Sequence, residues 1–294
     1  MSTPNYGAQL PTVSARRRRT DQTMRALLWV ATGIALIPLV LVVYYLFHKG
    51  VGQWSSNFFS TDPNGNFFGN HGGIRSALLG SIEIMAFATA VSVPLGIAVA
   101  VWLTEYGKDS LFANVVRYFV DVMTGVPSIV FGLFIYISLV ITHFGGSGYA
   151  AWKGALAVIL LMLPIVIRSA EVVLLLVPNS LREAALALGS PRWRVITRVV
   201  LPTSLSGLVT GALLAVARGM GETAPLLFTV SYTMNLSGNP NNLMNSLPVQ
   251  IFTDIKNPEP AIQARAWGAA LTLVMLVLIL NLIARAVSRR SRVA

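Results

Sequence analysis

The sequence contains no cysteine and few charged residues. Without cysteine among its 294 residues, it can form neither disulfide bonds nor thiolate metal sites. Charged residues make up only 11% of the chain, about half the fraction typical of soluble domains. This composition excludes an ordinary soluble globular domain.

Signatures of ATP binding, metal binding and catalysis are missing as well. No glycine-rich loop ends in Gly-Lys-Ser or Gly-Lys-Thr, so we do not expect the chain to bind ATP. His48, His71 and His143 are far apart and near the outer ends of apolar segments, which is typical of interfacial polar residues. No Ser/His or paired-Asp arrangement indicates an intramembrane enzyme. We therefore predict a chain with no bound cofactor, no metal and no enzymatic activity of its own.

Hydrophobic residues are what the chain has in abundance. They make up 54% of the sequence, and the mean hydropathy is +0.67. They form blocks near the ~20 residues that a helix needs to cross a ~30 Å hydrocarbon layer. We predict an all-α membrane protein, a polytopic bundle of six transmembrane helices. The expected spans are residues 25–47, 74–103, 114–142, 151–177, 204–230 and 266–287.

Lysine and arginine are divided unequally between the polar links. With the N-terminus inside, 15 of the 22 lie on the inner side, five on the outer side, and Arg168 and Arg218 within spans. The positive-inside rule therefore places both termini in the cytoplasm. We assign the net charge of +11 to contacts with anionic lipid and not to nucleic acid.

These boundaries divide the chain into three parts. Residues 1–25 are expected to form a disordered basic tail, residues 26–287 the membrane domain, and residues 288–294 a second basic tail. The first apolar block is too long for a signal-peptide core and lacks a clear cleavage site. We expect it to be retained as a helix.

The inner link between the fourth and fifth spans, residues 178–202, is predicted to hold two short helices. Residues 181–188 have high helix propensity, and Gly189 suits a helix end that needs a left-handed residue. Ser190 is expected to cap the next helix, with Pro191 in its first turn. An amphipathic helix lying on the bilayer is the alternative interpretation.

The same link resembles the cytoplasmic signature of ABC importer permeases. The matching residues are Glu183-Ala184-Ala185, Gly189 and Leu201-Pro202, with Val199 where isoleucine is usual. The resemblance implies a type I ABC importer permease fold in which Glu183, Ala184, Ala185 and Gly189 form a coupling helix against an ATPase. Small side chains at Ala184 and Ala185 would let that partner approach closely.

Three further segments resemble the permeases of phosphate-specific ABC importers, the PstA type. They are LTEYG (103–107), LPIVIRSAE (163–171) and ARGMGETAPLLFTV (217–230), and with the link they cover most of residues 74–287. The resemblance implies a permease for inorganic phosphate in the plasma (inner) membrane of a prokaryote. Its implied partners are a second homologous permease, two copies of an ATPase subunit that uses ATP, and an extracytoplasmic phosphate-binding protein.

Arg218 and Glu222 lie one helical turn apart in the fifth span. Charges in hydrocarbon are costly, so such residues normally face a partner or a water-filled path. Pro225 removes the helical hydrogen bond to Gly221, and Gly219 and Gly221 let the backbone bend, which predicts a broken helix. A broken helix is tolerated where it lines a cavity, so we expect a substrate path here. A structural ion pair between helices is the alternative.

The chemistry of this pair suits phosphate. A guanidinium presents forked donors to two oxygens at once. Phosphate retains a proton near neutral pH, so it can donate a hydrogen bond to the Glu222 carboxylate. Sulfate has no such proton, and the carboxylate would repel it. Thr223 is expected either to cap the half-helix after the break or to pack in the bundle.

Four other charges inside the spans have competing interpretations. Arg168 could contribute to the path, or it could pair with Glu171 at i+3 and extend to the headgroups. Glu83 is either a pore residue or interfacial, and Asp121 is expected to be structural.

The outer segment 231–265 could dock a binding protein or cap the bundle, and its apolar patch 247–252 could form a surface helix. Two rival functions remain: a permease for another oxyanion, such as sulfate or molybdate, and a secondary transporter driven by an ion gradient.

Overall fold

The computed structural model describes residues 14–65, 71–146 and 148–290. Within these ranges the chain is helical, with one isolated bridge between Pro63 and Gly72 in place of a sheet. The chain divides into an N-terminal unit, residues 1–48, and a larger unit, residues 49–294. The helical membrane fold expected from the composition is therefore confirmed.

The first helix, α1, spans Ala15–Gly50. The expectation of disorder through residue 25 is thus wrong for residues 15–25, while residues 1–13 lie outside the described ranges. Arginine is a good helix former, and Asp21 and Arg25 form an i,i+4 ion pair of 2.9 Å, so the basic segment extends the helix.

A short 3₁₀ turn, η1 (Val51–Gln53), follows α1, and fourteen further helical elements follow η1. Three of them, η2, η3 and η4, are π-helical. In chain order they are α2 (Ser56–Ser60), α3 (Arg75–Val101), η2 (Trp102–Gly107), α4 (Leu111–Gly125), α5 (Ser128–Ile135), η3 (Tyr136–Val140), α6 (Ala151–Leu175), α7 (Asn179–Ala187), α8 (Arg192–Val195), η4 (Ile196–Val200), α9 (Leu201–Met220), α10 (Ala224–Thr229), α11 (Leu247–Ile255) and α12 (Pro260–Arg290).

Five of the described helices are long and apolar enough to cross a membrane, and a bent pair brings the number to six if it crosses as one span. That pair is Leu111–Gly125 with Ser128–Val140, bent by 101°. The bend follows from Pro127, because the residue before a proline is driven out of the helical region; Val126 is extended, with φ −73° and ψ 130°. At the other end of the chain, α12 continues to Arg290, beyond the predicted boundary at residue 287.

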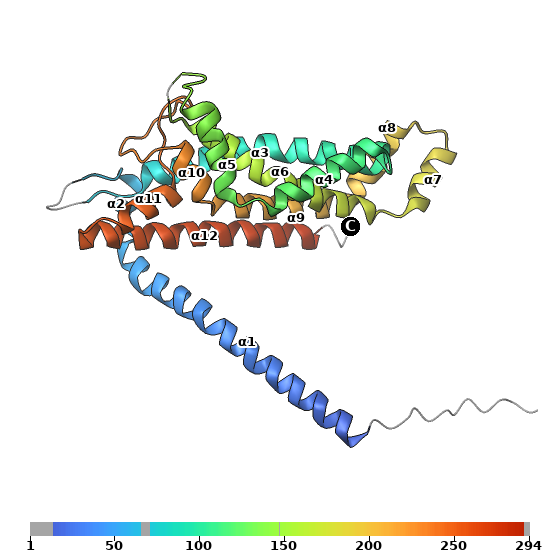
Figure 1. The fold of residues 1–294 in the computed structure, drawn as a ribbon, viewed down its shortest axis with the longest axis horizontal. Coiled ribbons are helices and arrows are strands. Elements are labelled where there is room, and N and C mark those ends of the chain that lie inside the picture. Colours follow the sequence, from blue (N-terminus) through green and yellow to red (C-terminus); the bar gives the residue numbers. More distant parts are fainter. Residues whose placement is uncertain (1–13, 66–70, 147, 291–294) are drawn as a thin grey trace, which may run out of the picture. The chain divides into compact units, whose positions relative to one another are not determined.

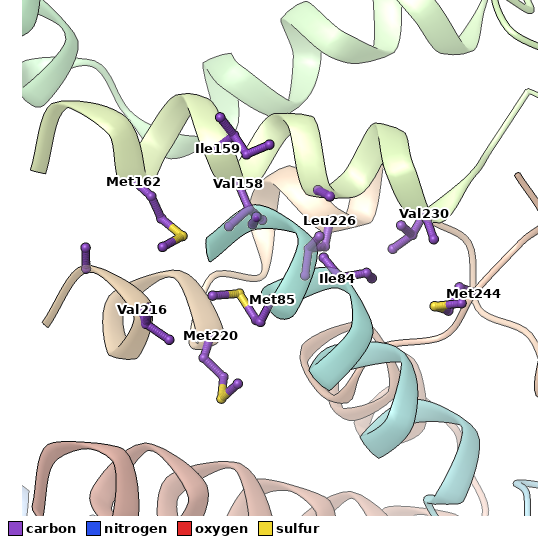
Figure 2. Packing of buried hydrophobic residues seen from close by; sticks show 14 of the residues in the cluster. Ile84, Met85, Val158, Ile159, Met162, Val216, Met220, Leu226, Val230 and Met244 are labelled. Carbon is purple, nitrogen blue, oxygen red and sulfur yellow. The ribbon is translucent and has the colours of Figure 1, made fainter. Parts of the chain in front are cut away.

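The core of the larger unit lies where α3, α6, α9 and α10 meet. Buried methionines from three of these helices, Met85, Met162 and Met220, pack together there (Figure 2). A Cβ added at Gly96 in α3 would lie 2.6 Å from Cγ1 of Val166, so α3 and α6 approach each other more closely than a larger residue would permit. This core holds the helix break of the fifth span in place.

Different elements form the two ends of the larger unit (Figure 1). At one end, the α7 end, lie α7 and α8 together with η2, which contacts α7; at the other, the α11 end, lie α2 and α11. At the α11 end, Arg265 donates two 2.8 Å hydrogen bonds to Asp254, with side chains only 4% and 2% exposed. Leu247 and its neighbours in α11 are buried, so this part of the outer segment caps the bundle.

Candidate functional site

The fifth predicted span is interrupted, as its glycines and proline predict. Helix runs from Arg192 through α8, η4 and α9 to Met220, and α10 begins at Ala224. Pro225 occupies the first turn of α10, where its missing N–H is not needed. The helix therefore starts at residue 192, twelve residues before the predicted start at 204, because α8 continues into the span without a turn.

Arg218 and Glu222 flank the end of α9. An Nη2 atom of Arg218 lies 3.3 Å from Oε1 of Glu222. The Arg218 side chain is 62% exposed, and that of Glu222 is 14% exposed. Within the described ranges Glu222 is the partner recorded for this guanidinium, so most of its N–H donors remain available to an anion.

The glycines of the break differ in what they require. A Cβ at Gly219 would lie 3.0 Å from Sδ of Met162 and 3.1 Å from Cε of Met85, so this glycine permits close packing of α9 on α6 and α3. Gly221 is exposed with φ −87°, a value open to any residue. Thr223 is the N-terminal cap residue of α10 by position, but its side chain makes no capping hydrogen bond, so of the two expected roles capping is not supported and packing in the bundle remains.

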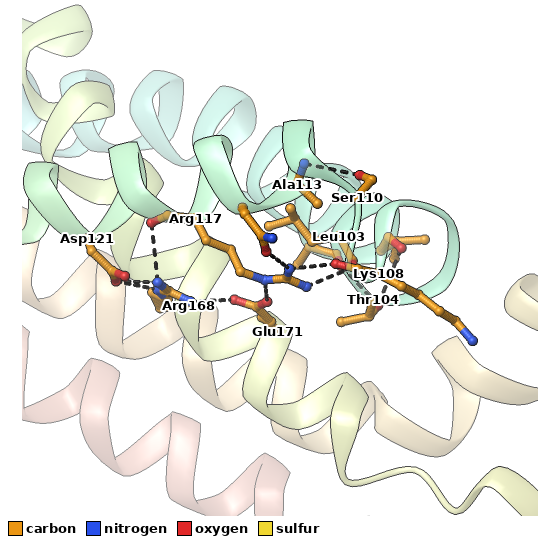
Figure 3. A network of polar contacts seen from close by, with 12 residues as sticks. Leu103, Thr104, Lys108, Ser110, Ala113, Arg117, Asp121, Arg168 and Glu171 are labelled. Carbon is orange, nitrogen blue, oxygen red and sulfur yellow. Dashed lines mark hydrogen bonds and ion pairs between the residues drawn. The ribbon is translucent and has the colours of Figure 1, made fainter.

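Arg168 lies in a network of charges between α4 and α6 (Figure 3). Its Nη1 donates to Oε2 of Glu171 at 2.7 Å, and its Nε donates to Oδ1 of Asp121 at 2.8 Å. Its Nη2 donates to the carbonyl of Arg117 at 3.3 Å. All three nitrogens are engaged, so Arg168 has far less capacity for a substrate anion than Arg218, and the pairing with Glu171 is the interpretation the geometry supports.

Arg117 completes this network. Its position in the sequence predicts only that it lies on the inner side of the membrane. Its Nε donates to Oε1 of Glu171 at 2.7 Å (Figure 3). The Glu171 side chain, 6% exposed, therefore receives one hydrogen bond from each of two arginines. Arg117 and Glu171 are 54 residues apart, so sequence spacing carries no signal for their pairing.

The inner link forms the expected corner between α7 and α8. Gly189 adopts φ +78°, the left-handed conformation predicted for it. The residue that caps α8 is Pro191, with no capping side chain, so the expected cap by Ser190 is wrong. Pro191 has φ −69° and ψ 152°, so the chain is extended immediately before α8, and the proline ring has no acceptor to offer the N–H groups of the first turn.

One side of α7 is exposed and the other packs on the bundle. Glu183 and Ala184 are exposed, whereas Ala185 is half-buried against the inner apolar cluster of α6 and η4. Leu186 and Leu188 are 45% and 87% exposed. Large apolar side chains beside a sharp corner are typical of a surface that another protein covers.

Glu83 is half-buried in α3 and lines a small cavity of about 40 Å³ with Phe87, Trp152 and Pro240. It precedes by two residues Met85, whose Cε lies 3.1 Å from a Cβ placed at Gly219 in the helix break. Across the described ranges, no group of three or more His, Asp or Glu residues could hold a metal ion.

A family model described as "Binding-protein-dependent transport system inner membrane component" matches residues 92–293. The chain is 40% identical over 280 residues to the phosphate transport system permease protein PstA 1 of Mycobacterium tuberculosis, covering 92% of this chain and 90% of that protein. It is 40% identical over 279 residues to PstA of Yersinia pestis, covering 94% and 92%.

Solved structures of ABC importers share the fold. A bacterial ABC transporter for the polysaccharide alginate matches with a TM-score of 0.64 at 13% identity, covering 92% of this chain and 96% of that chain. The inward-facing MetNI methionine transporter matches with a TM-score of 0.57 at 19% identity, covering 74% and 94%. With its family model, its relatives and its fold in agreement, the chain belongs to the inner membrane component family of binding-protein-dependent transport systems.

Proposed function

We propose that this chain is the transmembrane permease subunit of an ATP-driven importer for inorganic phosphate. The observation that supports the substrate is the 40% identity over more than nine tenths of the chain to relatives named phosphate transport permeases. The chain supplies half of the translocation path and catalyses no covalent step. ATP hydrolysis belongs to separate subunits.

The substrate passes the end of α9, where Arg218 and Glu222 stand at the break. Arg218 attracts the anion through N–H donors that its contact with Glu222 leaves open, and the Glu222 carboxylate accepts a hydrogen bond from the protonated oxygen of phosphate. Glu222 repels a fully deprotonated oxyanion of the same size, which lowers the rate for sulfate. Thr223, at the start of α10, adds a polar side chain along the same path. Arg168 has no part in it.

The α7 segment is the contact to the ATPase. A groove of the ATPase receives the corner formed by Glu183, Ala184, Ala185 and Gly189, of which Ala185 is half-buried and the others are exposed. Leu188 supplies an apolar contact. The α7 end then lies in the cytoplasm together with both termini, consistent with the basic residues at that end.

The complete transporter contains a second homologous permease, two copies of the ATPase and an extracytoplasmic phosphate-binding protein. That protein approaches the α11 end, where residues such as Met234, Leu236 and Leu243 are exposed beside the buried part of the outer segment. Anionic lipid surrounds the basic α7 end.

Phosphate uptake by the assembled complex in proteoliposomes tests this proposal. Arg218→Gln should abolish uptake while leaving protein level unchanged, and Arg25→Gln, which removes an arginine paired with Asp21 on the exposed helix α1, serves as the matched control. Normal uptake by the Arg218→Gln complex would show that Arg218 has a structural role and is not part of the substrate path.

Two further results would replace the proposal with a rival. Equal uptake of sulfate and phosphate would indicate a general oxyanion permease. Uptake that follows an ion gradient without ATP or an ATPase subunit would indicate a secondary transporter.

A further inference from the structure

Arg182, in the first turn of α7, is bound to two other helices as well as to its own. Its Nε and Nη2 atoms lie 3.0 and 2.9 Å from Oε1 of Glu105 in η2. Its Nη1 and Nη2 atoms donate to the carbonyls of Val177 and Leu174, which end α6, at 2.5 and 2.9 Å. The guanidinium thus joins α7 to the inner ends of both α3 and α6.

This ion pair is largely withdrawn from solvent. The side chains of Arg182 and Glu105 are 16% and 12% exposed. Salt screens such a pair weakly, and removing one partner leaves a partly buried charge without compensation. The pair is therefore a firm connection, unlike an ion pair at the surface.

The segment that carries Glu105 is itself fixed from a second side. Arg117 in α4 donates to the carbonyls of Leu103 and Lys108 at 3.0 and 2.6 Å (Figure 3). The π-helical geometry of η2 breaks the regular hydrogen-bond ladder and so exposes carbonyls to such donors. Lys108 ends the segment with φ 38°, a left-handed value rare for lysine. η2 is thus a junction of α3, α4, α6 and α7.

Displacement of η2 would reach the helix break through α3. α3 continues from η2 across the bundle, and its Met85 lies against Gly219, the residue after Arg218. The interior is close-packed, so a movement of α3 along or across its axis cannot be absorbed by empty space at that contact.

We propose that Glu105 and Arg182 form the mechanical joint through which a displacement of α7 reaches α3. The proposal rests on the proposed function, in which α7 receives the motion of the ATPase. Both are positioning residues, because neither lies near Arg218 and the path. The inner ends of α3 and α6 then move together with α7, because the Arg182 guanidinium is bonded to all three segments.

The test is the ratio of phosphate transported to ATP hydrolysed by the reconstituted complex. Glu105→Gln keeps the shape of the side chain and removes its charge; we expect ATP hydrolysis to continue while the ratio falls about tenfold, within the usual range of coupling between sites. Arg182→Lys keeps the charge but loses the fork, so its ratio should fall less. Asp21→Asn, which breaks the exposed Asp21–Arg25 pair of α1, should leave the ratio unchanged.

If the Glu105→Gln complex transported as much phosphate per ATP hydrolysed as the wild-type complex, the proposal would be refuted. If that variant does not assemble, the double variant Glu105→Cys/Arg182→Cys decides the question, since the natural chain has no other thiol. Bridging the two thiols with a bifunctional reagent should restore the ratio, and a bridged, assembled complex that stays uncoupled would refute the proposal. Phosphate uptake by the unaltered complex tests the proposed function separately: its absence would refute transport itself.

Discussion

Glu171→Gln would remove the negative charge that Arg117 and Arg168 share between α4 and α6. Each arginine donates to one carboxylate oxygen at 2.7 Å, and the Glu171 side chain is 6% exposed. A neutral amide offers one acceptor oxygen, and its NH₂ group would face a guanidinium. Both arginines would then keep their charge with less compensation.

The size of the loss follows from the burial of the three partners. Removing one partner of a buried ion pair costs about 3–5 kcal/mol. Arg117 and Arg168 are 24% and 31% exposed, so water compensates them in part, and we expect the lower end of that range, about 3 kcal/mol. This corresponds to a decrease of about 6–12 °C in melting temperature for a domain of this size.

Thermal unfolding of the purified protein, followed by the fluorescence of its six tryptophans, measures the change. Asp121→Asn is the matched control, because Asp121 pairs with the same Arg168 but its side chain is 60% exposed. An exposed pair contributes about 0–1 kcal/mol, so the control should shift the melting temperature by no more than about 4 °C. A larger shift in Asp121→Asn than in Glu171→Gln would refute the reasoning from burial.

Three other predictions follow from single positions. Gly189→Glu should abolish transport while the complex still hydrolyses ATP or fails to assemble, because the corner needs φ +78° and a small side chain; full transport would remove the coupling role. Gly132→Ala should destabilise the protein by about 1–3 kcal/mol in the same unfolding assay, since its Cβ would lie 2.5 Å from Cα of Pro225, whereas a Cβ at Gly125 meets nothing within 4 Å and Gly125→Ala should not destabilise through contact. Burial and the nearby Asp254 raise the pKa of Tyr232, so its contribution to stability is fully present below pH ~10 and is lost as the pH rises through the raised pKa; Tyr232→Phe should lessen the loss of stability in alkaline unfolding curves, and an unchanged curve would contradict this.

Local chemistry made several features of the fold predictable. The apolar blocks predicted the spans, and the run from Gly219 to Pro225 predicted the break. Each of these features depends on residues close to one another in the chain, so the spacing of residues in the sequence predicts it. The boundaries were less accurate at residues 15–25, where arginine extended the helix.

The ionic contacts show the opposite case. Arg168 looked equivalent to Arg218 in the sequence, since each is an arginine within an apolar span with an acidic residue a turn away. The structure separates them: Arg168 is engaged on three nitrogens, and Arg218 is 62% exposed with a single recorded partner. The difference arises from α4, which brings Arg117 and Asp121 to one arginine and not to the other.

Composition and the spacing of neighbouring residues are enough to establish that the chain is a helical membrane protein, where its fifth span breaks, and which charges lie in apolar segments. Which of these charges neutralise one another and which remain open depends on the packing of the helices. Glu105 and Arg182 are 77 residues apart, and Arg117 and Glu171 are 54 apart. Such pairs form because separate helices end at the same level of the bundle, and helix packing sets that level, not any local pattern of residues.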